Sequence, residues 1–227
     1  MKATKPKIFG LILAGGYSRR MGRDKAYLKF HGKPQIEHVF NLLKKHCVEV
    51  FLSKRKDQKA YKHFKYIDDA REFSNHGPLA GILSAMKEYP NADWLVMACD
   101  LPFVTDETIQ TLISLRDPQK QATAFISTQD TLPEPLCAIW EGHAYDSILK
   151  LFNEGIDCPR KILIKSDTHL LEPNDPHWLD NINTPQEYQK IRNSIILKGS
   201  VVKDLKIPLD SSANNKECPV RGPSPPE

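Results

Sequence analysis

The residues best suited to chemistry lie in a glycine-containing loop near the N-terminus. The apolar run at 8–13 predicts a buried strand, and Gly15 and Gly16 follow it almost at once. Arg20 and Lys25 belong to the same loop. Glycines let the backbone approach a ligand closely, Arg offers a planar fork of donors, and Lys offers a compact positive charge. A strand, a glycine loop and fixed cations in this order predict a polyphosphate-binding site.

The spacing of this loop differs from the two commonest phosphate-binding fingerprints. A dinucleotide fold has Gly-x-Gly-x-x-Gly, and a P-loop has Gly-x-x-x-x-Gly-Lys-Ser/Thr. Here the glycine pair is followed by Gly22 and then by Lys25. The structural alternative is a tight turn from strand to helix with surface cations, and the polyphosphate hypothesis explains more of these residues.

Carboxylates occupy the ends of two other predicted strands. Asp68 and Asp69 follow the strand at 65–67, and Asp100 follows the apolar run at 94–98 after one residue. Parallel strands end at one edge of a sheet, and ligands bind at that edge near a switch in strand order. Each aspartate alone fits a turn or a helix cap equally well. Beside phosphates, Asp100 would suit Mg²⁺, which takes one or two carboxylates together with phosphate oxygens and water.

Strands and helices alternate along the chain, which predicts an α/β fold with a doubly wound, mainly parallel sheet and helices on both faces. The strands are expected at 8–13, 48–52, 65–67, 94–98, 122–127, 136–140 and 169–172. The helices are expected to begin near Pro34, Pro78, Thr105, Ala144, Arg160 and Thr184. We expect one domain over residues 1–207, and a flexible tail at 208–227 because that segment is rich in Pro, Ser and Asn.

Composition narrows the function classes. The 227 residues are 40% hydrophobic and 26% charged, which is ordinary for a globular protein with a full core. The formal charge of +4 is modest and the basic residues form no single stripe, which argues against a nucleic-acid partner. The apolar runs are too short for a transmembrane helix, and the first one lacks a signal-peptide cleavage pattern. We therefore expect a cytoplasmic protein with no membrane partner.

Cysteines and histidines give no sign of a metal centre. The five cysteines are widely separated without a Cys-x-x-Cys pair, and the eight histidines lack ligand spacing. This pattern argues against zinc ribbons and thioredoxin-like redox sites. The cysteines are expected to be reduced thiols.

The loop resembles the signature of the nucleotidyltransferases with a doubly wound fold. The matching residues are Leu13-Ala14-Gly15-Gly16-x-Ser18-x-Arg20-Met21-Gly22-x-Asp24-Lys25. Later motifs narrow the resemblance to the molybdenum cofactor guanylyltransferases, a MobA-like family. These motifs are Ile67-Asp68-Asp69, Gly77-Pro78-Leu79-Ala80-Gly81, Cys99-Asp100-Leu101-Pro102, Pro135-Leu136-Cys137-Ala138 and Asn181-Ile182-Asn183-Thr184-Pro185. The resemblance covers residues 7–195.

The resemblance implies transfer of GMP from GTP to molybdopterin, with or without bound molybdenum, giving the guanine dinucleotide cofactor and pyrophosphate. It implies that Asp100 holds Mg²⁺ and that Lys25 and Arg20 act with it in catalysis. The residues that it assigns to GTP are Leu13, Ala14, Gly15, Gly16, Lys25, Ser53, Asp69 and Asp100. The family often has Asn where this chain has Ser53, a departure that bears on base specificity.

Fewer residues can be assigned to the binding of molybdopterin. The resemblance points to Asn181 and Asn183, where sugar-activating relatives commonly carry a second metal-binding Asp, and Arg160 and Lys161 are candidate phosphate partners. Three alternatives stay open. The chain could be a CTP-dependent molybdopterin cytidylyltransferase, a sugar-phosphate nucleotidyltransferase, or a nucleotide-binding adaptor that delivers cofactor to molybdoenzymes without catalysis.

Overall fold

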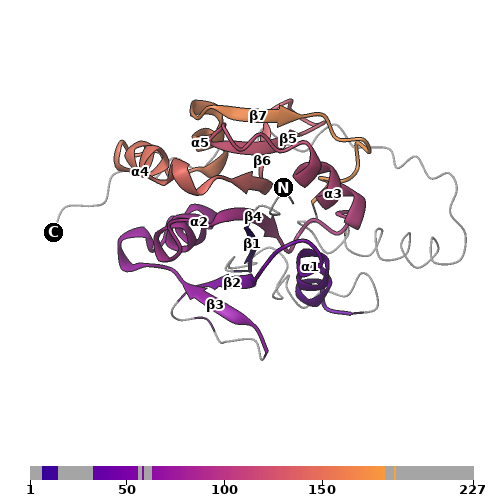
Figure 1. Ribbon diagram of the computed structural model, residues 1–227, viewed down its shortest axis with the longest axis horizontal. Helices are drawn as coiled ribbons and strands as arrows, with labels where there is room; N and C mark the ends of the chain where they lie inside the picture. The colour runs from indigo at the N-terminus through magenta and orange to yellow at the C-terminus, as the bar shows by residue number, and fades with distance from the viewer. Residues whose placement is uncertain (1–6, 15–32, 56–57, 59–62, 182–186, 188–227) are drawn as a thin grey trace, which may run out of the picture.

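The computed structural model describes residues 7–14, 33–55, 58, 63–181 and 187. Within these residues seven strands form one sheet in the order β3-β2-β1-β4-β6-β5-β7 (Figure 1). The strands are β1 (Ile8–Leu13), β2 (Val50–Lys54), β3 (Lys65–Asp68), β4 (Asp93–Ala98), β5 (Ala122–Ile126), β6 (Pro133–Trp140) and β7 (Thr168–Leu171). The helices are α1 (Gln35–Leu43), α2 (Pro78–Glu88), α3 (Asp106–Ser114), α4 (Tyr145–Asn153) and α5 (Pro159–Lys165), with short 3-10 helices η2 (Arg71–Phe73) and η3 (Gly142–Ala144). The predicted α/β class is confirmed.

The sheet is mainly parallel, as predicted, with one strand reversed. β1 pairs in parallel with β2 and β4, β2 with β3, and β5 with β7. β6 runs antiparallel to both β4 and β5, because residues 127–132 close a hairpin in which the Ser127 N–H donates to the Leu132 carbonyl at 2.8 Å. The chain builds β1, β2 and β3 outward and then returns to the other side of β1 for β4. The topological switch therefore lies between β1 and β4.

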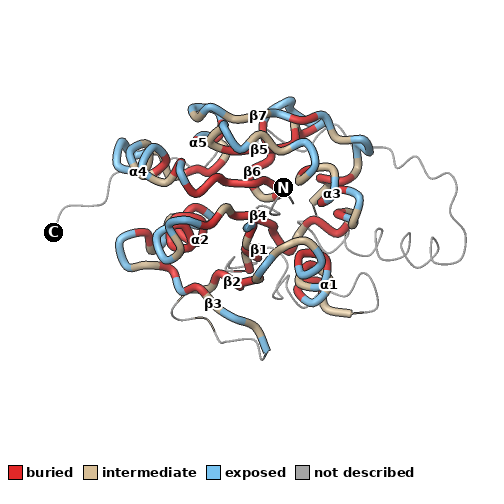
Figure 2. The backbone as a smooth tube through the Cα atoms, viewed as in Figure 1, coloured by how far each residue is buried: buried red, intermediate tan, exposed pale blue. Residues whose placement is uncertain are grey.

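Helices cover both faces of the sheet (Figure 1). Along β1, Ile8 and Ile12 pack on the side of α1 and α3, whereas Leu11 packs on the side of α2, α4 and α5. Figure 2 shows the central strands β1, β4 and β6 buried along their length, while β3 at the edge is partly exposed. Parallel strands covered on both faces are expected to be apolar runs without alternation, and the run at 94–98 has that pattern.

Helix starts follow the predicted local chemistry. Thr105 caps α3 with a capping box, in which its side chain accepts from the Thr108 N–H and the Thr108 side chain accepts from the Thr105 N–H. Gly77 has a φ of 55° directly before Pro78, the first residue of α2. Pro34 was expected in the first turn of its helix. It is instead the N-cap of α1, one position before the first helical residue, Gln35. The helix expected from Thr184 and the tail at 208–227 lie outside the described residues.

Within the described part of the chain, Cys47, Cys99 and Cys137 are reduced thiols, as expected from the sequence. No helix in the described part of the chain combines the length and apolarity needed to cross a bilayer.

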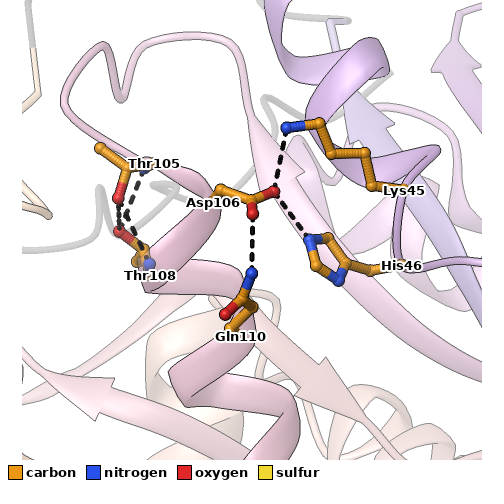
Figure 3. A network of polar contacts seen from close by, with 6 residues as sticks. All are labelled: Lys45, His46, Thr105, Asp106, Thr108 and Gln110. Atoms are coloured by element: carbon orange, nitrogen blue, oxygen red, sulfur yellow. Dashed lines mark hydrogen bonds and ion pairs between the residues drawn. The ribbon is translucent and has the colours of Figure 1, made fainter.

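A polar network ties the end of α1 to the start of α3 (Figure 3). The Asp106 carboxylate accepts from Lys45 Nζ at 3.2 Å, His46 Nε2 at 2.9 Å and Gln110 Nε2 at 2.7 Å. Hydrogen bonding from His46 is the largest cause of the lowered pKa of Asp106.

This network predicts an acid-dependent loss of stability. A carboxylate whose pKa is lower in the folded state stabilises the fold above its unfolded pKa of about 3.9, and that stabilisation is lost as the pH falls through the folded pKa. Asp106→Asn should therefore lower the free energy of unfolding at pH 7 and differ less from the wild type at pH 3. Urea denaturation at both pH values measures the difference. Asp146→Asn, in the first turn of α4, is the matched control. If Asp106→Asn lowered the free energy of unfolding equally at both pH values, the stabilising role of the ionised Asp106 carboxylate would be contradicted.

Candidate active site

The strand register brings the ends of β1, β2 and β4 to one edge of the sheet. Leu13 at the end of β1 lies opposite Ser53 of β2 on one side and Ala98 of β4 on the other. Because these strands are parallel, the chain leaves the sheet at the same level after each of them. The residues that follow include Ala14, which is buried, and Asp100, which is half-buried. This edge coincides with the topological switch.

The two adjacent acids at the end of β3 have different partners. Asp68 forms an ion pair with Lys54, 2.5 Å between Oδ1 and Nζ, and its side chain is 52% exposed. Asp69 is buried, and its Oδ1 accepts a hydrogen bond from Ser53 Oγ at 3.4 Å. Its backbone N–H donates to the Lys54 carbonyl. Of the two acids, Asp69 is therefore the one buried at this edge of the sheet, next to Ser53.

Helix α2 packs directly against these strand ends. A Cβ at Gly81 would overlap Ser53 Oγ and lie 3.0 Å from Leu13 Cδ2, so glycine is required for this close approach. One turn further along α2, Ser84 Oγ accepts from the Ala70 N–H at 2.8 Å. This hydrogen bond fixes the chain just after Asp69. The motif 77–81 thus positions the helix that supports the Ser53–Asp69 pair.

Two amide side chains hold the backbone at the same edge, and neither was selected from the sequence. Gln58 Nε2 donates to the Ala14 carbonyl at 3.1 Å. Gln35 Nε2, on fully buried Gln35, donates to the Leu101 carbonyl at 3.4 Å. They fix the chain beyond β1 and β4 respectively. A glutamine in one sequence carries no signal for such a contact, because its partner is a backbone atom distant in sequence.

On the far side of β4, the edge carries a second set of charged side chains. Arg160 of α5 contacts Asp130 in the β5–β6 hairpin and Glu134 of β6. Glu134 is buried, and burial is the largest cause of its raised pKa; the Leu136 N–H and Arg160 act against it, while the charge of Asp100 adds to it. Glu134 was not selected from the sequence, although it directly precedes the motif that begins at Pro135.

Several predicted site residues lie outside the described part of the chain, namely Gly15, Gly16, Arg20, Lys25 and Asn183. Of the remaining pterin candidates, Asn181 is half-buried and Lys161 is exposed on α5. Leu13, Ala14, Ser53, Asp69 and Asp100 gather at the switch edge, and Arg160 lies beyond β4 from the Ser53–Asp69 pair.

The described donors fit Mg²⁺ bound with a substrate better than a metal held by protein alone. Within the described ranges, no group of three or more His, Cys, Asp or Glu side chains could hold a metal ion. Asp100 supplies a half-buried carboxylate at the switch edge. Mg²⁺ is commonly bound by one or two carboxylates together with substrate phosphates and water, and a single aspartate meets that requirement.

A family model for the MobA-like NTP transferase domain matches residues 10–169. The chain belongs to this family. The match runs from β1 through β7 and includes the whole described edge, so the resemblance stated from the loop and the later motifs is confirmed. The model describes an NTP transferase domain, so the reaction class of the family is nucleotidyl transfer.

Curated relatives extend over most of the chain. A molybdenum cofactor biosynthesis bifunctional protein of Synechocystis is 36% identical over 191 residues, which are 83% of this chain and 54% of that protein. The chain thus spans about half the length of that relative. A molybdenum cofactor guanylyltransferase of Shewanella frigidimarina is 29% identical and is covered over 98% of its length, with 84% of this chain.

Solved structures share the fold. The crystal structure of molybdopterin-guanine dinucleotide biosynthesis protein A from Archaeoglobus fulgidus superposes with a TM-score of 0.67 at 23% identity. The superposition covers 84% of this chain and all of that one. At this identity the likeness establishes the nucleotidyltransferase fold of the MobA-like chain.

Proposed function

We propose that this MobA-like chain transfers GMP from GTP to the terminal phosphate of molybdopterin, with or without bound molybdenum. The observation that carries the proposal is the position of Asp100 at the topological switch, between the Ser53–Asp69 pair and Arg160. The proposal is supported by relatives named as molybdenum cofactor guanylyltransferases, because their alignments with this chain cover 96% and 98% of their length.

The nucleotide would occupy the β1–β2–β3 side of the switch. Leu13, Ala14, Gly15 and Gly16 would line it, and Asp69 would lie in the nucleoside pocket with Ser53 beside it. A buried carboxylate that accepts from a neighbouring hydroxyl can also accept from the amino and ring N–H groups of a base. The pterin would occupy the β6 side, with Arg160, Lys161, Asn181 and Asn183 as its candidate contacts.

The reaction needs charge stabilisation more than proton transfer. An oxygen of the molybdopterin phosphate attacks the α-phosphorus of GTP, a new P–O–P bond forms, and the bond to the β-phosphate oxygen breaks to release pyrophosphate. The attacking oxygen is already anionic at neutral pH, so no general base is assigned. Bringing two anions together and stabilising the charge on the transferred phosphoryl group calls for cations and positioning. Lys25 and Arg20 would supply these cations.

Asp100 would hold Mg²⁺ beside the nucleotide phosphates. When bound, the ion supplies positive charge that stabilises the developing charge on the α-phosphate and on the departing pyrophosphate. The carboxylate of Asp100 fixes the side of the switch on which that charge is delivered. We further propose that the product passes to molybdoenzymes, and the cytoplasmic location predicted from the sequence fits such a route.

Pyrophosphate release tests the proposal directly. The purified chain with Mg²⁺ is expected to release pyrophosphate only when GTP and molybdopterin are both present, and GTP is expected to compete successfully against equimolar CTP. Preference for CTP would indicate the cytidylyltransferase, and release with a sugar phosphate would indicate a sugar-activating enzyme. Nucleotide binding without release under any condition would support the delivery adaptor and contradict catalysis.

A further inference from the structure

The Arg160 guanidinium is held between two carboxylates of the β5–β6 hairpin. Its Nη1 lies 2.5 Å from Asp130 Oδ2, and its Nη2 lies 3.2 Å from Glu134 Oε2. The Asp130 side chain is 40% exposed, whereas that of Glu134 is 10% exposed. Exposed ion pairs are weak and exchange readily, whereas a buried carboxylate fixes its partner. Glu134 is therefore the firmer of the two anchors.

Glu134 is itself fixed from two sides. Its Oε1 accepts the Leu136 N–H at 3.0 Å, and its Oε2 accepts from Arg160. Each carboxylate oxygen is thus engaged by a protein donor. This arrangement suits a residue that orients a cation, and it differs from that of a carboxylate presented to a metal ion.

The register places this anchor near the chain that leaves β4. β4 and β6 are antiparallel, with Met97 opposite Cys137. β4 ends at Ala98 and β6 begins at Pro133, so the residues that follow β4, Asp100 among them, leave the sheet beside the start of β6. The negative charge of Asp100 contributes to the raised pKa of Glu134, in agreement with this proximity. Arg160 is consequently held beside the end of β4, on the side away from Ser53 and Asp69.

We propose that Glu134 is a positioning residue, which fixes the Arg160 guanidinium beside Asp100 so that it meets the terminal phosphate of the acceptor. The inference rests on the proposed function. A guanidinium has five N–H donors, and the two carboxylate contacts use one nitrogen each, so the fork can bind a phosphate oxygen while Glu134 holds it. Asp130, the more exposed anchor, is the partner that the phosphate would displace.

Glu134→Gln tests the inference with little change in volume. One amide oxygen cannot accept fully from both the Leu136 N–H and Arg160, so the guanidinium loses its fixed orientation. The KM for molybdopterin is expected to rise about tenfold, because misplaced binding groups are costly, while the KM for GTP stays within about twofold. Steady-state pyrophosphate release, with each substrate varied in turn, gives both constants.

A matched control lies at the opposite edge of the sheet. Glu141, just after β6, is also buried and paired with an arginine, Arg116. Glu141→Gln is expected to lower the melting temperature and to leave both KM values unchanged. A Glu134→Gln variant that only lowers the melting temperature, or that raises both KM values equally, would overturn the positioning role.

A double-mutant cycle separates action through Arg160 from an independent role. Arg160→Lys keeps the charge but loses the fork, so it should raise the KM for molybdopterin as Glu134→Gln does. The double variant should be no worse than either single variant, since both changes remove one arrangement. Additive effects would overturn the inference. If the wild-type chain released no pyrophosphate with GTP and molybdopterin, the proposed function would be overturned, and this inference with it. If the wild type were active and the Glu134→Gln variant had unchanged KM values, only the inference would be overturned.

Discussion

Replacing Asp100 with alanine is expected to lower turnover at least about a hundredfold while the protein stays folded, because transition-state charge stabilisation supplies effects of this size. Asp100 is the acid that follows β4 at the switch between β1 and β4. Without its carboxylate, Mg²⁺ would be held by the nucleotide phosphates and water alone. The variant should therefore also need a higher Mg²⁺ concentration for half-maximal activity. Pyrophosphate release, measured with GTP and molybdopterin over a Mg²⁺ series, tests both expectations.

Asp167→Asn supplies the control for this experiment. Asp167 is an exposed acid that pairs with Lys120 at 2.8 Å, directly before β7 and at the opposite edge of the sheet. Its loss removes the same charge without touching the switch, so activity should be unchanged. Circular dichroism and thermal melting show whether each variant is folded. A folded Asp100→Ala protein with full, Mg²⁺-dependent activity would falsify the metal assignment.

The elements that the sequence predicted well are those whose signal is local. The run at 94–98 is apolar without alternation because β4 is buried on both faces, and Thr105 caps α3 through a residue three positions away. β6 begins at Pro133 and was expected only from 136, because the two prolines at 133 and 135 hide its start. β6 runs antiparallel to β5 because residues 127–132 close a hairpin between the two strands, in which the Ser127 N–H donates to the Leu132 carbonyl.

Parts of the site were predictable by the same reasoning, and other parts were not. Asp69 and Asp100 could be selected because both follow predicted strands, and the register brings those strand ends together. Glu134, Gln35 and Gln58 could not, because each acts through a partner that is distant in sequence. Arg160 was proposed as a phosphate partner, but its two carboxylate anchors became visible only in the folded chain.

Gly81→Ala is expected to lower the free energy of unfolding, by about 1–3 kcal/mol for an overpacked buried site. Alanine would improve helix propensity by at most about 1 kcal/mol, which is a smaller effect. The added Cβ would overlap the buried Ser53 Oγ and lie 3.0 Å from Leu13 Cδ2, so α2 must shift or Ser53 must turn away from Asp69. Urea denaturation at pH 7 measures the loss, and the KM for GTP should rise because the nucleoside side is disturbed.

Ser53→Ala shows whether the overlap is the cause. This substitution removes the Oγ atom that the new Cβ would meet, although the Ser53 Cβ would remain 3.0 Å from it. The double variant should therefore be more stable than the sum of the two single effects predicts, since adjacent sites that share a contact are not additive. The rescue should be confined to stability, because the Ser53–Asp69 hydrogen bond is still lost and the KM for GTP stays high. If Gly81→Ala were more stable than the wild type, helix propensity would outweigh packing, and α2 would not need a glycine to approach the ends of β1 and β2.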